Sequence, residues 1–141
     1  MKPSHLLLIC LLGLPITLPA LEEPDTPLLQ PYDEASLLPI RSPSLRPGPV
    51  EPRPVNLPGI TALFLIGDDP RSHTWLQQRL PDLQRLGAAG LVVNVESAAA
   101  LQALRNRAPG LSLTPVPGDD LAVRLALTRY PVLITATVIE Q

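Results

Sequence analysis

The stretch TALFLIGDDP occupies residues 61–70 of the 141-residue chain, and its apolar part ends at Gly67. An apolar run of this length that stops at a glycine is typical of a strand buried on both faces of a sheet. Asp68 and Asp69 can accept hydrogen bonds from the free amides of a following helix, whose first turn tolerates Pro70. The stretch therefore predicts the first strand and first helix of an α/β domain.

The sequence after Pro70 repeats this strand-and-helix pattern. Leucines spaced three and four apart predict a first helix that kinks or breaks at Pro81 and ends near Gly87. The later elements are predicted from apolar runs and polar caps: a strand at 91–95, a helix from Ser97, a strand at 111–116, a helix capped by Asp119 or Asp120, and a strand from Pro131. This order favours a small three-layer α/β sandwich with a mostly parallel sheet, over residues 59–141.

The amino-terminal part has a different composition. Lys2 and His5 precede an apolar run at 6–18, and Ala20 follows it. This pattern predicts a secretory signal peptide over 1–20 and a periplasmic protein, with an uncleaved membrane anchor as the alternative.

A proline-rich stretch follows the predicted signal peptide. Ten of the 19 prolines fall within residues 21–58, where apolar periodicity is weak. Because proline fixes φ and lacks an amide donor, we expect an extended, semi-rigid linker there. The alternative is a docking strip for a partner protein, formed by Leu37, Leu38 and Ile40.

The overall composition excludes several classes of function. The chain has 11 basic and 13 acidic residues and is 3% aromatic, which disfavours binding of nucleic acid by bulk charge or by stacking. The single cysteine, Cys10, and the single lysine, Lys2, both lie in the predicted signal peptide. A processed chain would therefore contain no disulfide, thiol nucleophile or Schiff-base lysine, and no cofactor is expected.

The dipeptide Tyr130-Pro131 stands directly before an apolar strand. This arrangement resembles the cis-proline strand of thioredoxin-like domains, in which that loop faces an end of the first helix. Where such domains place their redox cysteines, this chain reads GDDPRSHT over residues 67–74. The resemblance implies a thioredoxin-like scaffold without oxidoreductase activity, and whether the bond at Pro131 is cis stays open.

The acidic pair Asp68-Asp69 has two explanations. Helix capping is favoured, because carboxylates stabilise the amino-terminal end of a helix. The alternative is a site for Mg²⁺ or Ca²⁺, since other possible ligands follow predicted strands as well. Those residues are His73, Glu96, and Asp119 or Asp120. No spaced metal motif is present, so we predict no metal site and expect His73 to be a surface residue of the first helical turn.

Three long segments resemble an uncharacterised protein family encoded by integrating conjugative elements of Gram-negative bacteria. They are residues 37–54, 62–97 and 117–141, and their most specific strings are LFLIGDD (63–69), GLVVNVES (90–97) and YPVLIT (130–135). Members of that family lie in gene clusters for a type IV secretion-like conjugation apparatus, which implies a role in element transfer. A more distant similarity connects the chain with pilin-assembly proteins of F-type conjugation systems, which have a cysteine-less thioredoxin-like domain.

These observations lead to two hypotheses. The first is an exported, non-enzymatic component of the conjugation apparatus, whose partners are other proteins of that apparatus. Its binding edge would comprise the loops at 67–74 and 130–131, that is Asp68, Asp69, Arg71, His73, Tyr130 and Pro131. The second is a periplasmic metal-dependent hydrolase or ligand-binding domain that uses the acidic loop. Residues 136–141 either complete a hairpin within the domain or add a strand to a neighbouring protein.

Overall fold

The computed structural model describes Gly13 and residues 33–141, of which Asp33–Gln141 form one compact unit. Apart from Gly13, the predicted signal peptide and the first part of the predicted linker lie outside the described residues. Among the helices that the structure describes, none combines the length and the apolar composition needed to cross a membrane.

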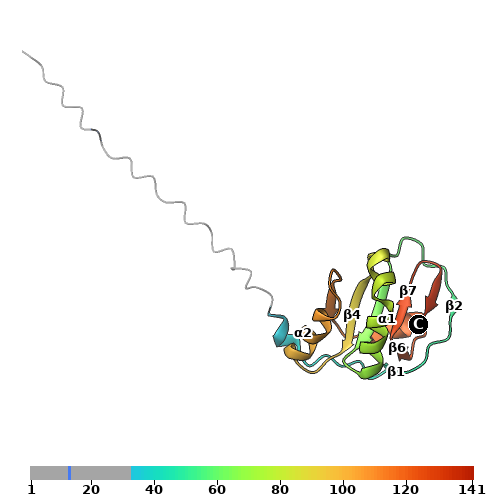
Figure 1. Cartoon of the computed structure of the whole chain (residues 1–141), viewed down its shortest axis with the longest axis horizontal. Coiled ribbons are helices and arrows are strands. Elements are labelled where there is room, and N and C mark those ends of the chain that lie inside the picture. Colours follow the sequence, from blue (N-terminus) through green and yellow to red (C-terminus); the bar gives the residue numbers. More distant parts are fainter. Residues whose placement is uncertain (1–12, 14–32) are drawn as a thin grey trace, which may run out of the picture. The chain divides into compact units, whose positions relative to one another are not determined.

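The described unit consists of helices on both sides of a twisted sheet (Figure 1). Its elements in chain order are the 3₁₀ helix η1 (Glu34–Leu37), β1 (Arg46–Pro47), β2 (Arg53–Pro54), β3 (Leu63–Gly67), α1 (Pro70–Leu86), β4 (Ala89–Asn94), α2 (Ala98–Asn106), β5 (Leu113–Pro115), α3 (Asp119–Leu125), β6 (Arg129–Tyr130), β7 (Val132–Ile134) and β8 (Val138–Glu140). The predicted α/β class is confirmed.

The main sheet has six strands in the order β2-β8-β7-β3-β4-β5, while β1 and β6 form a separate parallel pair. Only β3–β4 and β4–β5 are parallel, and the other three pairings of the main sheet are antiparallel. The prediction of a mostly parallel sheet is therefore wrong. The chain between β5 and β7 passes through α3 and then through β6, which brings it back to the edge where β3 ends, so β7 starts there and runs antiparallel to β3.

Each face of the sheet has its own apolar core. Alternate residues of a strand point to opposite faces, so Phe64 and Ile66 face one side while Leu65 faces the other. The first core joins β3 and β4 to helices α1 and α2, through buried residues that include Leu76, Leu83, Leu101 and Leu104. The second core joins the other face to α3 and to the chain before β3, through Leu45, Val93, Ala122, Val132, Ile134 and Ile139.

The proline-rich segment that was predicted as a linker is packed against the domain from Asp33 onward. Ile40 exchanges two backbone hydrogen bonds with Val95, at 2.9 and 3.0 Å, and β2 pairs with β8. Ile40 and Leu45 are buried, whereas Leu37 is 40% exposed. The folded unit thus begins well before the expected boundary at residue 59, and Ile40 of the suggested docking strip contacts its own domain.

Helix α1 follows the predicted caps but not the predicted interruption. The Asp69 side chain accepts the Ser72 amide at its start, and Gly87 ends it with φ 58°, in the left-handed region that favours glycine. The helix is continuous through Pro81, so a break there is not observed. Proline removes a single helical hydrogen bond, and the buried Leu76 and Leu83 hold the turns on both sides.

Helix α3 begins differently from the prediction. Its N-cap is Gly118, which makes no side-chain cap hydrogen bond, so neither Asp119 nor Asp120 is the cap. The Asp119 carboxylate instead accepts the Ser44 amide at 3.0 Å and the Ser44 hydroxyl. These hydrogen bonds lower the pKa of Asp119 from its ordinary value. A contact with a residue 75 positions earlier thus replaces the expected local one.

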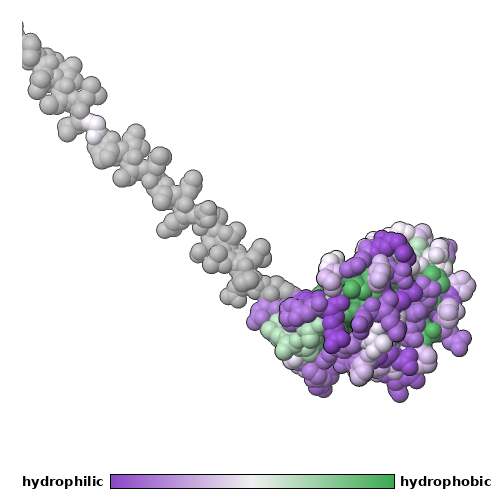
Figure 2. Space-filling model, in the orientation of Figure 1, coloured by the Kyte–Doolittle hydropathy of each residue, from purple (hydrophilic) through white to green (hydrophobic). Residues whose placement is uncertain are grey.

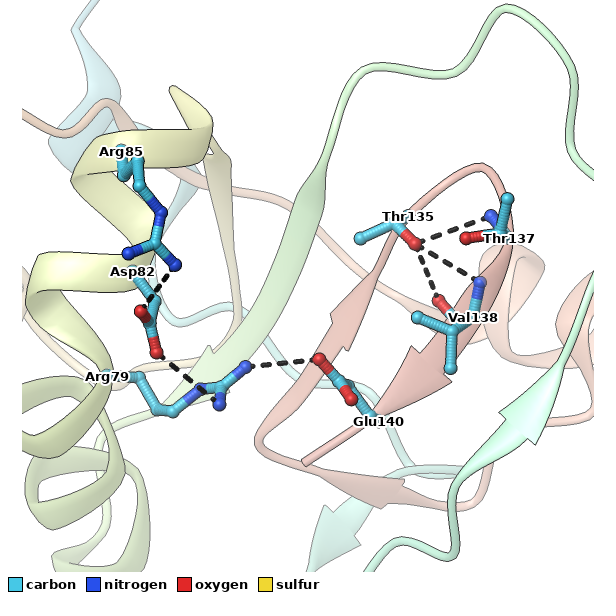
Figure 3. A network of polar contacts seen from close by, with 7 residues as sticks. All are labelled: Arg79, Asp82, Arg85, Thr135, Thr137, Val138 and Glu140. Atoms are coloured by element: carbon cyan, nitrogen blue, oxygen red, sulfur yellow. Dashed lines mark hydrogen bonds and ion pairs between the residues drawn. The ribbon is translucent and has the colours of Figure 1, made fainter.

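The carboxyl-terminal residues complete a hairpin within the domain. Strand β8 pairs with β7 on one side and with β2 on the other. The Thr135 hydroxyl oxygen accepts the Val138 amide in the turn at 3.1 Å, and Glu140 forms an ion pair with Arg79 of α1 at 3.3 Å (Figure 3). Residues 136–141 are therefore engaged inside this chain.

Candidate functional site

Three strand ends meet at one edge of the main sheet. Strands β3 and β4 end there with Gly67 and Asn94, and Tyr130 leads through Pro131 into β7. The Tyr130 ring lies against Gly67 so closely that a β-carbon at that position would be 2.7 Å from the ring. The thioredoxin-like resemblance implied that the loop at 130–131 faces an end of the first helix, and this loop contacts Gly67 of the loop at 67–74.

Asp69 is fully engaged in the start of α1. Its Oδ2 accepts the Ser72 amide at 2.9 Å, and its Oδ1 accepts the Ser72 hydroxyl at 2.6 Å. The Ser72 oxygen in turn accepts the Gly67 amide at 3.0 Å. The capping explanation is confirmed for Asp69, whose two oxygens hold the loop in shape.

Asp68 makes a different contact. Its Oδ1 lies 2.9 Å from Nε2 of His73, which donates the hydrogen bond because an ionised carboxylate can only accept. Nδ1 of His73 is buried and has no hydrogen-bond partner among the described residues. The Asp68 side chain stays 34% exposed, so one carboxylate of the acidic pair is available at the surface.

Asn94 connects the strand ends, and the sequence analysis did not single it out. Its Oδ1 accepts the Ser42 amide at 2.8 Å, and its Nδ2 donates to the Tyr130 hydroxyl at 3.1 Å. The signal was an amide side chain within the apolar run LVVNV, because strands seldom contain asparagine. No sequence pattern indicated the contact with Ser42, because Ser42 belongs to the segment that was predicted as a linker.

Tyr130 is the buried polar group of this edge, with 3% of its surface exposed. Burial raises the pKa of its phenol above the ordinary value of 10.0, the hydrogen bond from Asn94 opposes this, and the negative charge of Asp69 adds to the rise. The phenol is therefore neutral at physiological pH. Its hydroxyl accepts a hydrogen bond from Asn94 and its ring packs against Gly67, so Tyr130 connects the loop at 130–131 with the ends of β3 and β4.

A small pocket opens between these elements. It has a volume of about 130 Å³ and is lined by Ile40, Asp68, Asn94, Val95, Glu96 and Tyr130. Two of its lining side chains are carboxylates, and the exposed Glu96 forms an ion pair with Arg41 at 3.3 Å. The pocket is smaller than the roughly 300–1,000 Å³ of typical small-molecule sites. Its size and charge suit a single basic side chain.

Arg71 and Pro131 lie beside this pocket. Arg71 is exposed on α1 and lies 3.5 Å from Oε1 of Gln141. It also lines a wider groove of about 380 Å³, together with Pro70, Thr74, Trp75, Gln78 and Gln141. Pro131 is buried, its carbonyl accepts Nε2 of Gln141 at 2.9 Å, and the Tyr130–Pro131 bond is cis, as is Leu38–Pro39. Of the predicted site residues, Asp68 and Tyr130 thus line the small pocket and Arg71 lines the wider groove.

The suggested metal ligands do not come together as a set. No group of three or more histidine, cysteine, aspartate or glutamate side chains within the described part of the chain could hold a metal ion. Asp68 and Glu96 line the same pocket, whereas Asp119 contacts Ser44 and Asp69 is used by Ser72. The arrangement offers exposed carboxylates beside a buried phenol, which is the chemistry of a polar contact surface.

The visible face of the domain is mostly hydrophilic, with apolar side chains in smaller patches (Figure 2). A protein-family model described as "Protein of unknown function (DUF2859)" matches residues 17–139. No curated protein and no solved structure matches the chain. The matched range covers the proline-rich segment as well as the α/β part. In the structure, too, residues 33–58 of that segment belong to the same compact unit as the α/β part.

Proposed function

This chain belongs to the DUF2859 family, and from that premise we propose that it is an exported, non-enzymatic component of a conjugative DNA-transfer apparatus. Its role is to contact other proteins of a type IV secretion-like assembly in the periplasm. The finer description of the domain as thioredoxin-like is part of this proposal. It is supported by the pattern β-α-β in β3, α1 and β4, and by the antiparallel β7 beside β3.

One observation supports the proposal above the others. The three strings with the most specific resemblance to the conjugative-element family form the adjacent strands β7, β3 and β4 at the centre of the sheet. Their polar ends, at 67–69, 94–97 and 130–131, lie at one edge. The apolar parts of these strings serve the core, whereas Asp68 and Glu96 are exposed and serve no core contact.

The edge is suited to binding a protein with a basic side chain. Asp68 and Glu96 line a pocket that has room for one such group, and Ile40 and Val95 supply an apolar wall. A charge-assisted hydrogen bond to a carboxylate is among the stronger polar contacts between proteins. Because Asn94 and Tyr130 fix the strand ends, little ordering is needed when a partner binds.

The test is the frequency of element transfer from a donor strain that lacks the gene. A plasmid copy of the natural gene should restore transfer. Copies that carry Asp68→Asn or Glu96→Lys should restore it about tenfold less well, since the first removes and the second reverses a negative charge that a basic partner needs. Asp120→Lys is the matched control, because Asp120 is exposed on α3 and does not line this pocket.

Immunoblots of the donor cells must show equal protein levels for all variants. Unchanged transfer after deletion of the gene contradicts the proposed function. Loss of transfer on deletion, with full restoration by both edge variants, leaves the apparatus role standing but removes this edge as the contact surface.

A further inference from the structure

A second set of charged side chains surrounds the small parallel pair β1–β6. Arg46 of β1 and Arg129 of β6 occupy paired positions in this ladder. Paired positions on neighbouring strands project to the same face, and the strands lie about 4.8 Å apart. Two like charges at that spacing repel one another, so the pair does not stabilise the strands by its charge.

A groove of about 260 Å³ lies beside Arg129. It is lined by Pro49, Val50, Glu51, Arg53, Ala126, Leu127, Thr128 and Arg129. The groove thus combines two guanidinium groups and one carboxylate with apolar walls. It shares no lining residue with the pocket at Asp68 or with the groove on α1.

Each of the two arginines that line the groove, Arg53 and Arg129, makes a close contact with the backbone. The Arg53 guanidinium donates to the Leu125 carbonyl at the end of α3. The helix ends at Ala126, whose φ of 52° lies in the left-handed region, a strained conformation for a residue other than glycine. Strained residues of this kind collect at functional sites, where the surrounding structure maintains them.

Gly48 positions the second arginine. Its missing side chain lets the Arg129 chain lie directly over the backbone, because a β-carbon there would be 2.7 Å from Cδ of Arg129. Arg129 lines the groove together with residues 49–51 and Arg53. A groove with preformed cationic groups needs little ordering of side chains when a ligand binds.

Within residues 33–141, six arginines have no ionic partner: Arg53 and Arg129 of the groove, and Arg46, Arg71, Arg107 and Arg124. Arg41, Arg79, Arg85 and Arg105 form ion pairs with carboxylates. Residues 33–141 as a whole are neutral. Of the 11 basic residues only Lys2 lies outside this range, and of the 13 acidic residues only Glu22, Glu23 and Asp25 do, which leaves ten of each. The groove is therefore a local positive site on a neutral domain.

We propose that this groove binds the carboxylate side chains of an acidic segment of another protein. The planar fork of arginine forms paired hydrogen bonds with carboxylates, and the apolar walls accommodate the aliphatic parts of the segment. A long phosphate polymer or an anionic membrane fits less well, because such partners bind through many cationic groups spread over a surface and only two guanidinium groups line this groove. This inference does not rest on the proposed role in conjugation.

The experiment measures binding of a fluorescein-labelled hexaglutamate peptide to the full chain by fluorescence anisotropy, with hexaglutamine as the neutral probe. The full chain should bind hexaglutamate and not hexaglutamine. Arg53→Gln combined with Arg129→Gln should weaken binding about tenfold or more, because the two cationic donors that line the groove are lost. The matched control is Arg107→Gln combined with Arg124→Gln, which removes the same charge from exposed residues that do not line the groove.

A second variant protects the test against simple misfolding. Glu51→Gln removes the one carboxylate that lines the groove, so it should tighten binding of hexaglutamate by roughly two- to threefold. Equal binding by the natural chain and the double variant at Arg53 and Arg129 overturns the proposal. So does tighter binding, through the same arginines, of a single-stranded oligonucleotide or of phosphatidylglycerol vesicles than of hexaglutamate.

Discussion

The two faces of the main sheet are covered by different kinds of structure. One face packs against α1 and α2, which contribute rows of buried leucines. The other packs against the short α3 and against an extended segment, residues 42–60, that contains prolines and only two-residue strands. Both cores are equally closed to solvent, since Leu65 and Phe64 on opposite sides of β3 are each 0% exposed.

This difference shows that an extended segment without regular secondary structure can cover one face of a sheet, as helices do on the other face. A buried amide without a partner destabilises a fold, and proline has no amide hydrogen to satisfy. The segment can therefore lie along the sheet with few backbone bonds, such as those from Val55 to Thr137 at 3.0 Å and from Leu57 to Ala136 at 2.9 Å. Its few apolar side chains provide the packing.

The strongest test of this comparison removes the segment. A chain that starts at Gly59 should lose its cooperative fold, whereas a chain that starts at Asp33 should keep it. Burial of Ile40 and Leu45 alone contributes about 3–6 kcal/mol, comparable with the whole stability of a small domain. Urea unfolding followed by the fluorescence of Trp75 measures this, and a cooperative transition in the shorter chain would show that the segment is dispensable.

A single substitution on each face makes the comparison quantitative. Leu45→Ala in the extended segment and Leu83→Ala in α1 should each lower the free energy of unfolding by about 2–4 kcal/mol, because both side chains are buried. Chemical denaturation of the two variants gives the values. A cost below about 1 kcal/mol for Leu45→Ala would mean that the segment is only loosely attached.

The polar anchor of the segment should have a smaller effect. The buried Ser42 hydroxyl donates to the Val93 carbonyl at 2.7 Å and accepts the Gly118 amide at 2.7 Å. Ser42→Ala leaves these two groups without a partner and should cost about 1–3 kcal/mol. The exposed Ser36→Ala, whose hydroxyl donates to Asp33, is the control and should change stability by less than about 0.5 kcal/mol.

The phenol of Tyr130 reports the second core by its ionisation. In a Tyr32→Phe chain it is the only tyrosine, and its absorbance should titrate above pH 10.0 because burial raises its pKa. A raised pKa means that the contribution to stability is complete below pH 10 and is lost as pH rises through the folded-state pKa. Asp69→Asn should lower the pKa of Tyr130. Titration at or below pH 10 would contradict a buried phenol.

The smallest expected effect concerns the end of α3. Ala126→Gly should raise the free energy of unfolding by about 0.5–1 kcal/mol, because glycine adopts the left-handed conformation without strain. Ala99→Gly in the right-handed α2 is the matched change and should lower it by about 0.5–1 kcal/mol. The two shifts, measured by thermal unfolding, should have opposite signs, and a loss of stability in both would exclude strain at Ala126.

Local patterns predicted the elements around α1 well. The run LFLIG, the cap at Asp69 and the stop at Gly87 involve residues that are neighbours in sequence. The nearness of the loop at 130–131 to the start of α1 was implied only by the resemblance to thioredoxin-like domains, and Gly67 contacts Tyr130. The start of α3 was missed, because Asp119 finds its partner in Ser44 and such a partner leaves no local pattern.

The sequence by itself determined the α/β class and the strand-and-helix order, because these depend on hydrophobic spacing and on caps within a few residues. Only the tertiary structure decided the direction of β7, the place of residues 33–58 and the role of Asn94. The reason is physical: whether an extended proline-rich chain is a linker or a layer of the core depends on what it packs against. That surface is built by residues far along the chain, and it exists only after the chain has folded.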